Sequence, residues 1–369
     1  MRIVLTGGCT GGHIYPALAI GDKFKEMQPD CEVIFVAHQY GLETTIVPKA
    51  GYDLKIVTAD WFERSKPYTV PKTLLNTERG TLQALKIMKE FKPDIVVSTG
   101  SFVSVPVVRA GIKYGADIYI QEQNAFPGLS NKLLSKYAKN IFLGFEAGRN
   151  QFKEPDKCVY SGNPVRAEFS GRDRIADRKE LGIPENDLVI MAFGGSLGSD
   201  TINDIGLGLL EKYSGKKGVT IIFGTGRDYY DDVVKAVESK GIKLAGNIHM
   251  APYIDGMPRT LSASDIVISR AGALSVAEIT MTGRAAIFVP SPNVTADHQY
   301  FNAKAVADVG GALLYRENET TKSNVLSAVE ELEREPERIR AMEAASAKIA
   351  PTHATDIIYN TIMENYEGN

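Results

Sequence analysis

Cysteine is scarce in this chain, and long apolar runs are absent. Its 369 residues include only three cysteines, Cys9, Cys31 and Cys158, whose spacing matches neither a disulfide framework nor a zinc site, so a reducing cytosolic compartment is favoured. No apolar run approaches the roughly 20 residues that a helix needs to cross a bilayer. A strand pattern follows directly after Arg2, and we therefore expect neither a transmembrane helix nor a secretory signal.

Two common nucleotide-binding motifs are missing as well. There is no Gly-x-x-x-x-Gly-Lys-Ser/Thr sequence, which excludes phosphoryl transfer of the P-loop type. No glycine turn has the Gly-x-Gly-x-x-Gly spacing, which disfavours a nicotinamide cofactor. Neither a His/Cys cluster nor a pair of aspartates at a strand end offers ligands to a divalent metal. We therefore expect a site with no metal and no cofactor.

Apolar segments of strand length alternate with amphipathic segments of helix length along nearly the whole chain. Their valine and isoleucine residues form continuous runs, which is typical of parallel strands covered on both faces. A hydrophobic fraction of 44% with 24% charged residues is that of a soluble globular protein, here of the α/β class. The predicted strands are residues 3–6, 33–37, 54–57, 95–99, 118–121, 141–143, 158–161, 188–193, 219–223, 248–251, 266–269, 286–289 and 312–314.

The β/α pattern begins twice, each time with a glycine-rich turn after an apolar strand. These turns are residues 6–13 and 193–199. Glycine lets the backbone N–H groups at a helix start approach an anion closely, and a chain of this length suits two domains. We predict two Rossmann-like parallel-sheet domains facing across a cleft. Their expected limits are 1–163 and 164–350, followed by a C-terminal helix, 351–369, that packs back on the first domain.

His13 ends the first glycine turn, three residues before Pro16, which a first helical turn tolerates. The imidazole is thereby placed near a positive helix N-terminus at the carboxyl ends of the strands, where ligands bind in open α/β sheets. Because the helix end favours the neutral ring, His13 is a candidate general base. The alternative is a histidine that only caps the helix or belongs to the turn.

Polar side chains crowd the segment 121–131, which begins at the end of a predicted strand. We predict that Asn124 contacts the substrate and that Glu122 is the second candidate base. Asn131 either contacts the substrate or, like Ser130, caps the following helix, and the sequence leaves both functions open.

In the second half of the chain, residues 269–273 follow a predicted strand and open a helix that contains Glu278. Small residues at a helix start let a diphosphate reach the backbone N–H groups. Glu278, one to two turns further along, can accept hydrogen bonds from both hydroxyls of a ribose. An ordinary exposed helical glutamate is the alternative.

A second loop that opens a helix lies further along, at residues 290–303. Its side chains Asp297, Gln299 and Asn302 can bind sugar hydroxyls, although Asp297 is also suited to cap the helix. Without a metal, a departing diphosphate must be neutralised by helix N-termini and arginine. Arg166 and Arg270 are the candidates for that role.

Taken together and in this order, six segments resemble the motif set of the MurG family of bacterial glycosyltransferases. The resemblance runs from residue 3 to about residue 310 and is carried by residues 7–17, 122–128, 162–166, 194–198, 269–278 and 297–303. It implies a glycosyltransferase B fold and an inverting transfer of N-acetylglucosamine from UDP-N-acetylglucosamine to undecaprenyl-diphospho-muramoyl-pentapeptide, converting lipid I to lipid II for peptidoglycan synthesis. It also implies peripheral attachment to the inner face of an anionic cytoplasmic membrane, and no nucleic-acid partner.

The resemblance also assigns site residues, position by position. Around the diphosphate and sugar of the donor it places Thr10, Gly11, Gly12, Asn124, Arg166 and Ser196. Around the diphosphate and ribose it places Ala273, Leu274, Ser275, Val276, Ala277 and Glu278. The backbone of Ile254 would hold uracil, Gln299 would bind the sugar hydroxyls, and His13 would face the acceptor.

Two positions depart from the family pattern. Gln121 stands where a histidine is common, and Ser101 stands where a second glycine is usual. Both lie in the half of the chain that the resemblance assigns to the acceptor, so they bear on acceptor specificity and leave the donor assignment unchanged.

The segment 72–92 combines apolar residues at helical spacing with five lysines and arginines. Such a helix can lie at the boundary of anionic headgroups, and the lipid acceptor implied by the resemblance favours this interpretation. The alternative is a helix that only covers the sheet, with Leu82, Leu85 and Met88 in the core.

Two other functions remain open from the sequence alone. A related UDP-sugar enzyme, such as an epimerase or a transferase to another lipid acceptor, would turn over the UDP-sugar without lipid I. A non-catalytic two-lobed binding protein would normally be exported, and the missing signal sequence and the two anion-binding turns argue against it.

Overall fold

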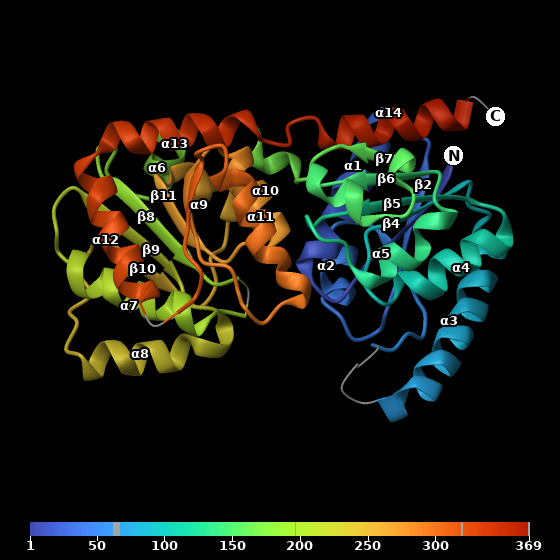
Figure 1. The fold of residues 1–369 in the computed structure, drawn as a ribbon, viewed down its shortest axis with the longest axis horizontal. Coiled ribbons are helices and arrows are strands. Elements are labelled where there is room, and N and C mark those ends of the chain that lie inside the picture. The colour runs from blue at the N-terminus through green and yellow to red at the C-terminus, as the bar shows by residue number, and fades with distance from the viewer. Residues whose placement is uncertain (62–66, 196, 319, 368–369) are drawn as a thin grey trace. The chain divides into compact units, whose positions relative to one another are not determined.

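The computed structural model describes residues 1–61, 67–195, 197–318 and 320–367, and its contacts divide the chain into two α/β units (Figure 1). Unit 1 comprises Met1–Arg166 together with His353–Asn369, and unit 2 comprises Ala167–Thr352. The division falls a few residues beyond the limits expected from the sequence, and the C-terminal segment belongs to unit 1.

Unit 1 is built on a sheet of parallel strands, sheet A, in the order β3-β2-β1-β4-β5-β6-β7. The strands are β1 (Arg2–Thr6), β2 (Glu32–Ala37), β3 (Asp53–Ile56), β4 (Ile95–Ser98), β5 (Asp117–Glu122), β6 (Asn140–Leu143) and β7 (Cys158–Tyr160). The α-helices are α1 (Gly11–Met27), α2 (Glu43–Lys49), α3 (Val70–Phe91), α4 (Ser104–Tyr114), α5 (Leu129–Leu134) and α14 (Ala354–Glu367). Helices α1, α2 and α14 contribute to one hydrophobic cluster, and α3, α4 and α5 contribute to another.

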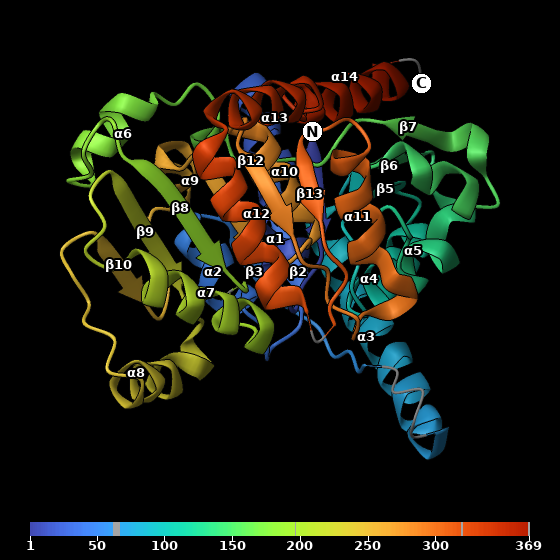
Figure 2. The same ribbon diagram turned by 60° about the vertical axis from the view of Figure 1, so that its left-hand side comes forward.

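Unit 2 is built on a second parallel sheet, sheet B, in the order β10-β9-β8-β11-β12-β13 (Figure 2). The strands are β8 (Leu188–Phe193), β9 (Val219–Gly224), β10 (Ile248–Ala251), β11 (Ile266–Ser269), β12 (Ala285–Phe288) and β13 (Ala312–Leu314). The α-helices are α6 (Arg174–Glu180), α7 (Asp200–Tyr213), α8 (Tyr230–Ser239), α9 (Met257–Ala263), α10 (Ala273–Met281), α11 (His298–Ala307), α12 (Thr321–Arg334) and α13 (Pro336–Lys348). Helices α7, α8, α12 and α13 share one large hydrophobic cluster with the sheet.

Burial on both faces explains why the strands appear in the sequence as unbroken apolar runs. Successive side chains of a strand point to opposite faces of its sheet. In β1, Ile3 and Leu5 belong to the cluster on the α1 face, whereas Val4 belongs to the cluster on the α4 face, and all three are fully buried. All of the predicted strands are confirmed, each within one residue of its expected ends.

Each sheet has one point where the strand order reverses, and both points lie beside a glycine turn. In sheet A, β1 lies between β2 and β4; in sheet B, β8 lies between β9 and β11. Ligands of open α/β sheets bind outside the carboxyl ends of the strands at such points. The residues that follow β1, β4, β8 and β11 are therefore where the fold favours a binding site.

The last helix, α14, packs on the first one, α1, within unit 1. Ile358 and Ile362 of α14 are fully buried in the hydrophobic cluster that contains α1. Lys23 on α1 forms an ion pair with Asp356 on α14, with 2.8 Å between Nζ and Oδ1. This ion pair lowers the pKa of the Asp356 carboxyl below its ordinary value of 3.8.

A depressed carboxyl pKa stabilises the folded state above the ordinary pKa, and the contribution is lost as the pH falls through the folded value. We therefore expect Asp356→Asn to lower the urea midpoint of unit 1 at pH 7 by the small amount typical of surface ion pairs, and the difference from wild type to vanish at about pH 2. The fluorescence of Trp61, the single tryptophan, reports the unfolding of unit 1. Glu364→Gln is the matched control, because Glu364 is exposed on the same helix. An equal effect of both variants at pH 7 would contradict the prediction.

Candidate functional site

The glycine turn after β1 places a helix N-terminus at the carboxyl end of sheet A. Thr10 is the N-cap residue of α1 and is exposed, and its side chain makes no capping hydrogen bond. Gly11 and Gly12 begin the helix and are half-buried. Backbone N–H groups in this first turn are therefore suited to an anion or a polar ligand.

The first glycine turn is held by a buried carboxylate, that of Glu43, which the sequence analysis did not identify. Glu43, at the start of α2, is fully buried, and its Oε2 accepts a hydrogen bond of 2.9 Å from the backbone N–H of Cys9. Cys9 has a φ of 69°, in the left-handed region that few side chains adopt. A Cβ on Gly8 would lie 2.7 Å from Glu43 Oε1, so any larger residue there would displace this carboxylate. No local motif signals this contact, because its partners are 34 residues apart.

His13 is held by two oxygen atoms at one of its ring nitrogens. Its Nδ1 lies 2.8 Å from the carbonyl oxygen of Thr99 and 2.9 Å from Oε1 of Gln123. Because a carbonyl oxygen can only accept, Nδ1 carries the proton in the neutral ring and Nε2 is the basic nitrogen. The Thr99 hydroxyl donates in turn to the carbonyl of His13 at 2.7 Å. The imidazole thus has a fixed tautomer and a fixed orientation.

A chain of buried side-chain amides supports the contact between Gln123 and His13. The Nε2 of Gln123 donates to the carbonyl of Thr99 and to Oε1 of Gln121. Gln121 donates to Oδ1 of Asn163 at 3.1 Å, and Asn163 donates to the carbonyl of Gln123 at 2.9 Å. Gln121, which departs from the family pattern, is fully buried within this chain. Gln121 therefore influences His13 indirectly, through its hydrogen bond to Gln123, and is not exposed to a ligand.

Glu122 organises the loop that follows β5. One carboxylate oxygen accepts from the backbone and side-chain nitrogens of Asn124, at 2.9 and 3.2 Å. The other accepts from the backbone of Gly128 at 3.0 Å and from Nδ2 of Asn131 at 2.8 Å. The side chain is 1% exposed. Four donors on one buried carboxylate fix the position of Asn124, which is half-buried at the carboxyl end of sheet A.

The remaining predicted residue of unit 1, Arg166, stacks on an aromatic side chain of α1. Its guanidinium carbon lies 4.6 Å from the centre of the Tyr15 ring. Tyr15 is two residues beyond His13, so the arginine is held at the first turns of α1. Such a cation–π contact orients a guanidinium and leaves it charged.

Ser101, the second departure from the family pattern, has a φ of 76°. Glycine adopts this conformation without strain, whereas other residues are disfavoured in it by roughly 1–2 kcal/mol. The backbone thus accounts for the glycine that is usual at this position. The Ser101 hydroxyl lies 3.5 Å from Sγ of Cys9 in the first glycine turn.

In unit 2, the glycine turn after β8 is closely packed. A Cβ on Gly198 would lie 2.4 Å from the carbonyl of Thr225, and one on Gly194 would lie 2.6 Å from the backbone nitrogen of Ser199. Ser199 then caps α7 by accepting from the backbone of Ile202. Ser196, which the resemblance assigns to the donor site, lies outside the described residues.

Helix α10 presents its N-terminus at the carboxyl end of β11. Gly272 is the N-cap residue and supplies no side-chain cap. Ala273, Val276 and Ala277 are buried, whereas Leu274, Ser275 and Glu278 are half-buried.

The other predicted residues of unit 2 lie after neighbouring strands. Ile254, after β10, is half-buried against Gly224 at the end of β9. Oε1 of Gln299 accepts from the backbone of Ser291 at 2.9 Å, which fixes the loop after β12. Asn302 is fully buried and donates to the carbonyl of Ala271 at 3.2 Å, so it stabilises the turn before α10.

Asp297, which the sequence offered as a cap or as a sugar ligand, makes no capping bond, and it forms an ion pair of 2.9 Å with Arg316. Arg316 also stacks on Tyr300, with 3.7 Å between its guanidinium carbon and the ring centre. The carboxylate is thereby bound to the loop after β13.

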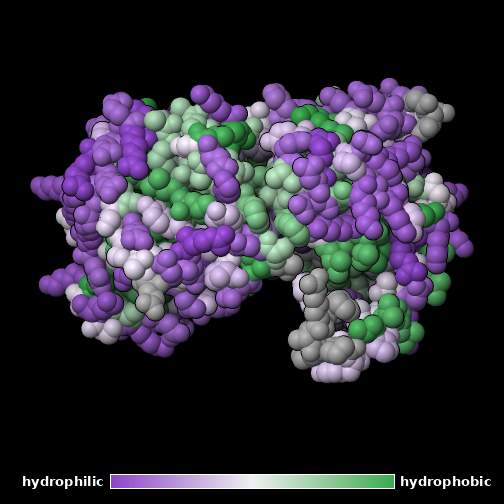
Figure 3. Space-filling view, in the orientation of Figure 1, coloured by the Kyte–Doolittle hydropathy of each residue, from purple (hydrophilic) through white to green (hydrophobic). Residues whose placement is uncertain are grey.

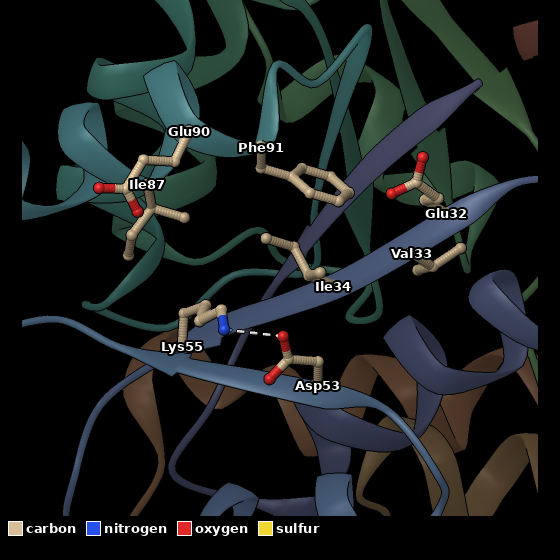
Figure 4. Close-up of a pocket in the computed structure, with 8 residues that line it drawn as sticks. All are labelled: Glu32, Val33, Ile34, Asp53, Lys55, Ile87, Glu90 and Phe91. Carbon is tan, nitrogen blue, oxygen red and sulfur yellow. Dashed lines mark ion pairs between the residues drawn. The ribbon is translucent and has the colours of Figure 1, made fainter.

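The pocket in Figure 4 lies at the opposite end of sheet A from the first glycine turn. It is lined by Glu32 and Asp53, the first residues of β2 and β3, and by residues at the end of α3. Lys55 and Asp53 form an ion pair of 2.8 Å across its floor. Because ligands of parallel sheets bind at the carboxyl ends of the strands, we place the functional site at the glycine turns instead.

Two parallel Rossmann-type sheets, each with a glycine turn at its strand-order reversal, define a two-domain α/β protein of the glycosyltransferase B type. The Glycosyltransferase family 28 N-terminal domain matches residues 3–143, and the Glycosyltransferase family 28 C-terminal domain matches residues 189–358. The chain belongs to glycosyltransferase family 28.

Similar proteins cover nearly the whole chain. A UDP-N-acetylglucosamine--N-acetylmuramyl-(pentapeptide) pyrophosphoryl-undecaprenol N-acetylglucosamine transferase of Clostridioides difficile is 38% identical over 99% of this chain and 89% of its own length. The transferase of the same name from Moorella thermoacetica is 37% identical over 100% of both chains. The crystal structure of Acinetobacter baumannii MurG superposes with a TM-score of 0.75 at 25% identity, covering 98% of this chain and 99% of that one. A putative UDP-N-acetylglucosamine 2-epimerase of Listeria monocytogenes shares the fold, with a TM-score of 0.74 at 15% identity, covering 100% and 97%.

Proposed function

We infer that this enzyme transfers N-acetylglucosamine from UDP-N-acetylglucosamine to undecaprenyl-diphospho-muramoyl-pentapeptide, converting lipid I to lipid II in peptidoglycan synthesis. The observation that carries this conclusion is the identity of 37–38% over 99–100% of the chain to transferases of that name. The residues that carry the sequence resemblance support it, since they follow strands at the carboxyl ends of the two sheets.

The donor site that we propose lies in unit 2. The N-terminus of α10, from Ala273 to Ser275, would receive the diphosphate on backbone N–H groups, because the first N–H groups of a helix have no partner within it. Val276 and Ala277, which the resemblance also assigns to this site, lie in the second turn, and the N–H of Val276 already donates to the carbonyl of Gly272 at 2.9 Å. Glu278, half-buried on the same helix, would accept the ribose hydroxyls. The backbone of Ile254 would hold uracil, and Gln299 would bind the sugar. To the diphosphate and sugar of the donor the resemblance also assigns Ser196 of this unit and, in unit 1, Thr10, Gly11, Gly12, Asn124 and Arg166.

We propose a direct displacement with inversion at the anomeric carbon. The acceptor sugar hydroxyl attacks that carbon, the new glycosidic C–O bond forms, and the bond to the diphosphate oxygen breaks, so that UDP leaves with the bonding electrons. The hydroxyl proton passes to Nε2 of His13. The hydrogen bonds from Nδ1 to Thr99 and Gln123 support this role, because they leave Nε2 able to accept a proton.

For Glu122 the contacts favour positioning over proton transfer. Both of its oxygens already accept two hydrogen bonds from residues of the same loop. We propose that this carboxylate holds Asn124 in place for the donor and that His13 is the base.

Turnover of UDP-N-acetylglucosamine separates this function from its alternatives. We expect UDP release that depends on a short-chain lipid I analogue, with a disaccharide-containing lipid as the second product. An epimerase would form a new UDP-sugar without acceptor, and a binding protein would release no UDP. Chromatography of the nucleotide and lipid products with and without acceptor distinguishes the three. UDP-sugar turnover that is independent of lipid I would refute the proposed acceptor.

Replacing His13 tests the mechanism. A positioned general base contributes about 10²–10⁴-fold, so His13→Ala should lower kcat by that order while the affinity for UDP-N-acetylglucosamine is largely kept. Calorimetry measures the affinity, and UDP release measures the rate. Gln123→Ala should lower kcat less, because it removes one partner of the imidazole and leaves the ring. A wild-type kcat for His13→Ala would show that His13 is not the general base.

We also propose that the protein attaches peripherally to the cytoplasmic face of the cell membrane through α3. Leu74, Leu75 and Leu82 are 61%, 52% and 64% exposed, and the space-filling view shows apolar surface near the amino-terminal end of the helix (Figure 3). Of the three residues that the alternative placed in the core, Leu82 is exposed, Leu85 is partly buried against the core and Met88 is fully buried. In the described part of the chain no helix is long and apolar enough to cross a membrane.

Three exposed basic residues accompany these leucines, and each adds about 1 kcal/mol near anionic headgroups. We expect the triple variant Lys72→Glu, Arg79→Glu, Lys86→Glu to co-sediment less with anionic vesicles at low salt while still binding UDP-N-acetylglucosamine. The matched control carries the same change of charge on exposed residues of unit 2: Arg334→Glu, Arg340→Glu and Lys348→Glu. If both triple variants lose binding equally, the attraction is to net charge, and α3 is not the docking surface.

A further inference from the structure

One arginine side chain connects its own loop to three others at the carboxyl end of sheet B. Nε of Arg270 donates to the hydroxyl of Ser199 at 2.9 Å. Its Nη1 donates to the carbonyls of Val289 and Pro290, at 3.0 and 3.2 Å. The same nitrogen lies 2.5 Å from Oε2 of Glu317. These partners follow β8, β12 and β13, and Arg270 itself follows β11.

The four strands are consecutive neighbours in the sheet, in the order β8-β11-β12-β13. Three of the loops after them, those that follow β8, β11 and β12, carry residues of the proposed donor site or adjoin one. Ser199 ends the second glycine turn, Arg270 precedes α10, and Pro290 precedes Ser291, whose backbone N–H binds Gln299. One guanidinium, 14% exposed, therefore bridges these loops.

We infer that Arg270 is a positioning residue that joins the donor-site loops after β8, β11 and β12 to the loop after β13, and that its charge is balanced by Glu317 and does not bind the diphosphate. This differs from the expectation that Arg270 neutralises the leaving group. The planar guanidinium suits the task, because its nitrogens diverge and can bond acceptors in several directions at once. A lysine concentrates its donors on one nitrogen and cannot reach the same set. The inference rests on the proposed donor.

The chain offers a matched control in Arg284. Its side chain is 14% exposed, as is that of Arg270. It donates to the carbonyls of Thr282 and Ser264, at 2.7 and 3.1 Å, and lies 3.4 Å from Glu343. These partners adjoin the amino ends of β11 and β12, at the opposite end of the sheet. Burial and bonding are thus similar, and only the location differs.

The dissociation constant of UDP-N-acetylglucosamine, measured by calorimetry, tests the inference. Losing hydrogen bonds to a charged group should raise the constant about tenfold or more. We expect this for Arg270→Lys as well as for Arg270→Met, with the KM for the lipid acceptor unchanged. Arg284→Lys should lower the melting temperature and leave the donor constant at its wild-type value.

Glu317→Gln gives the sharpest distinction. If Arg270 positions the loops, removing the charge of its partner loosens the guanidinium and weakens donor binding. If Arg270 instead binds the diphosphate, the same change frees the cation and tightens donor binding. Combining Glu317→Gln with Arg270→Met should add little to Arg270→Met alone, because both act on one network.

Three results would overturn the inference: wild-type affinity in Arg270→Lys with loss in Arg270→Met, tighter binding in Glu317→Gln, or an equal loss in Arg284→Lys. The last would reduce the effect to general destabilisation. Failure of the wild-type protein to bind UDP-N-acetylglucosamine would refute the proposed donor and this inference with it. Wild-type binding with unaffected Arg270 variants would overturn this inference alone.

Discussion

All strands of each sheet run in one direction, and the rest of the site depends on this constraint. Parallel strands deliver every strand-to-helix loop to the same edge, so glycine turns, helix N-termini and polar side chains from distant segments meet there. Loops at such an edge have few backbone partners of their own. They need side chains that bind several of them at once.

The two units meet this need with groups of opposite charge. In unit 1 the Glu122 carboxylate collects backbone and side-chain N–H groups of the loop after β5. In unit 2 the Arg270 guanidinium collects a hydroxyl and two carbonyls from neighbouring loops. A carboxylate can only accept and a guanidinium can only donate. Glu122 therefore binds the N–H groups of its loop, and Arg270 binds the oxygen atoms of neighbouring loops. Neither charge has to contact a substrate to influence how one is bound.

The fold was predictable from the sequence because two-sided burial leaves continuous apolar runs and the glycine turns mark strand ends. The positions of His13, Asn124 and the α10 start follow from the same pattern. The contacts of Glu43 and Arg270 do not, since they join segments whose proximity is set by strand order in the sheet. No motif in the sequence connects Glu43 with the first turn, and the arginine at position 270 suggested a ligand contact where the structure shows protein partners. Helix periodicity likewise left undecided whether Leu82 was buried.

The return of α14 to unit 1 has a consequence for the order in which the protein is made. Gln28 and Tyr359, 331 residues apart, meet where α1 and α14 pack. The ribosome makes α14 after all of unit 2, so the nascent N-terminal half waits, with the surface of α1 that packs on α14 uncovered, while unit 2 is synthesised. Domains generally fold as units once their residues are available. Unit 2, although most of it comes later in the sequence, is therefore the first to have every residue it needs, and unit 1 is completed afterwards.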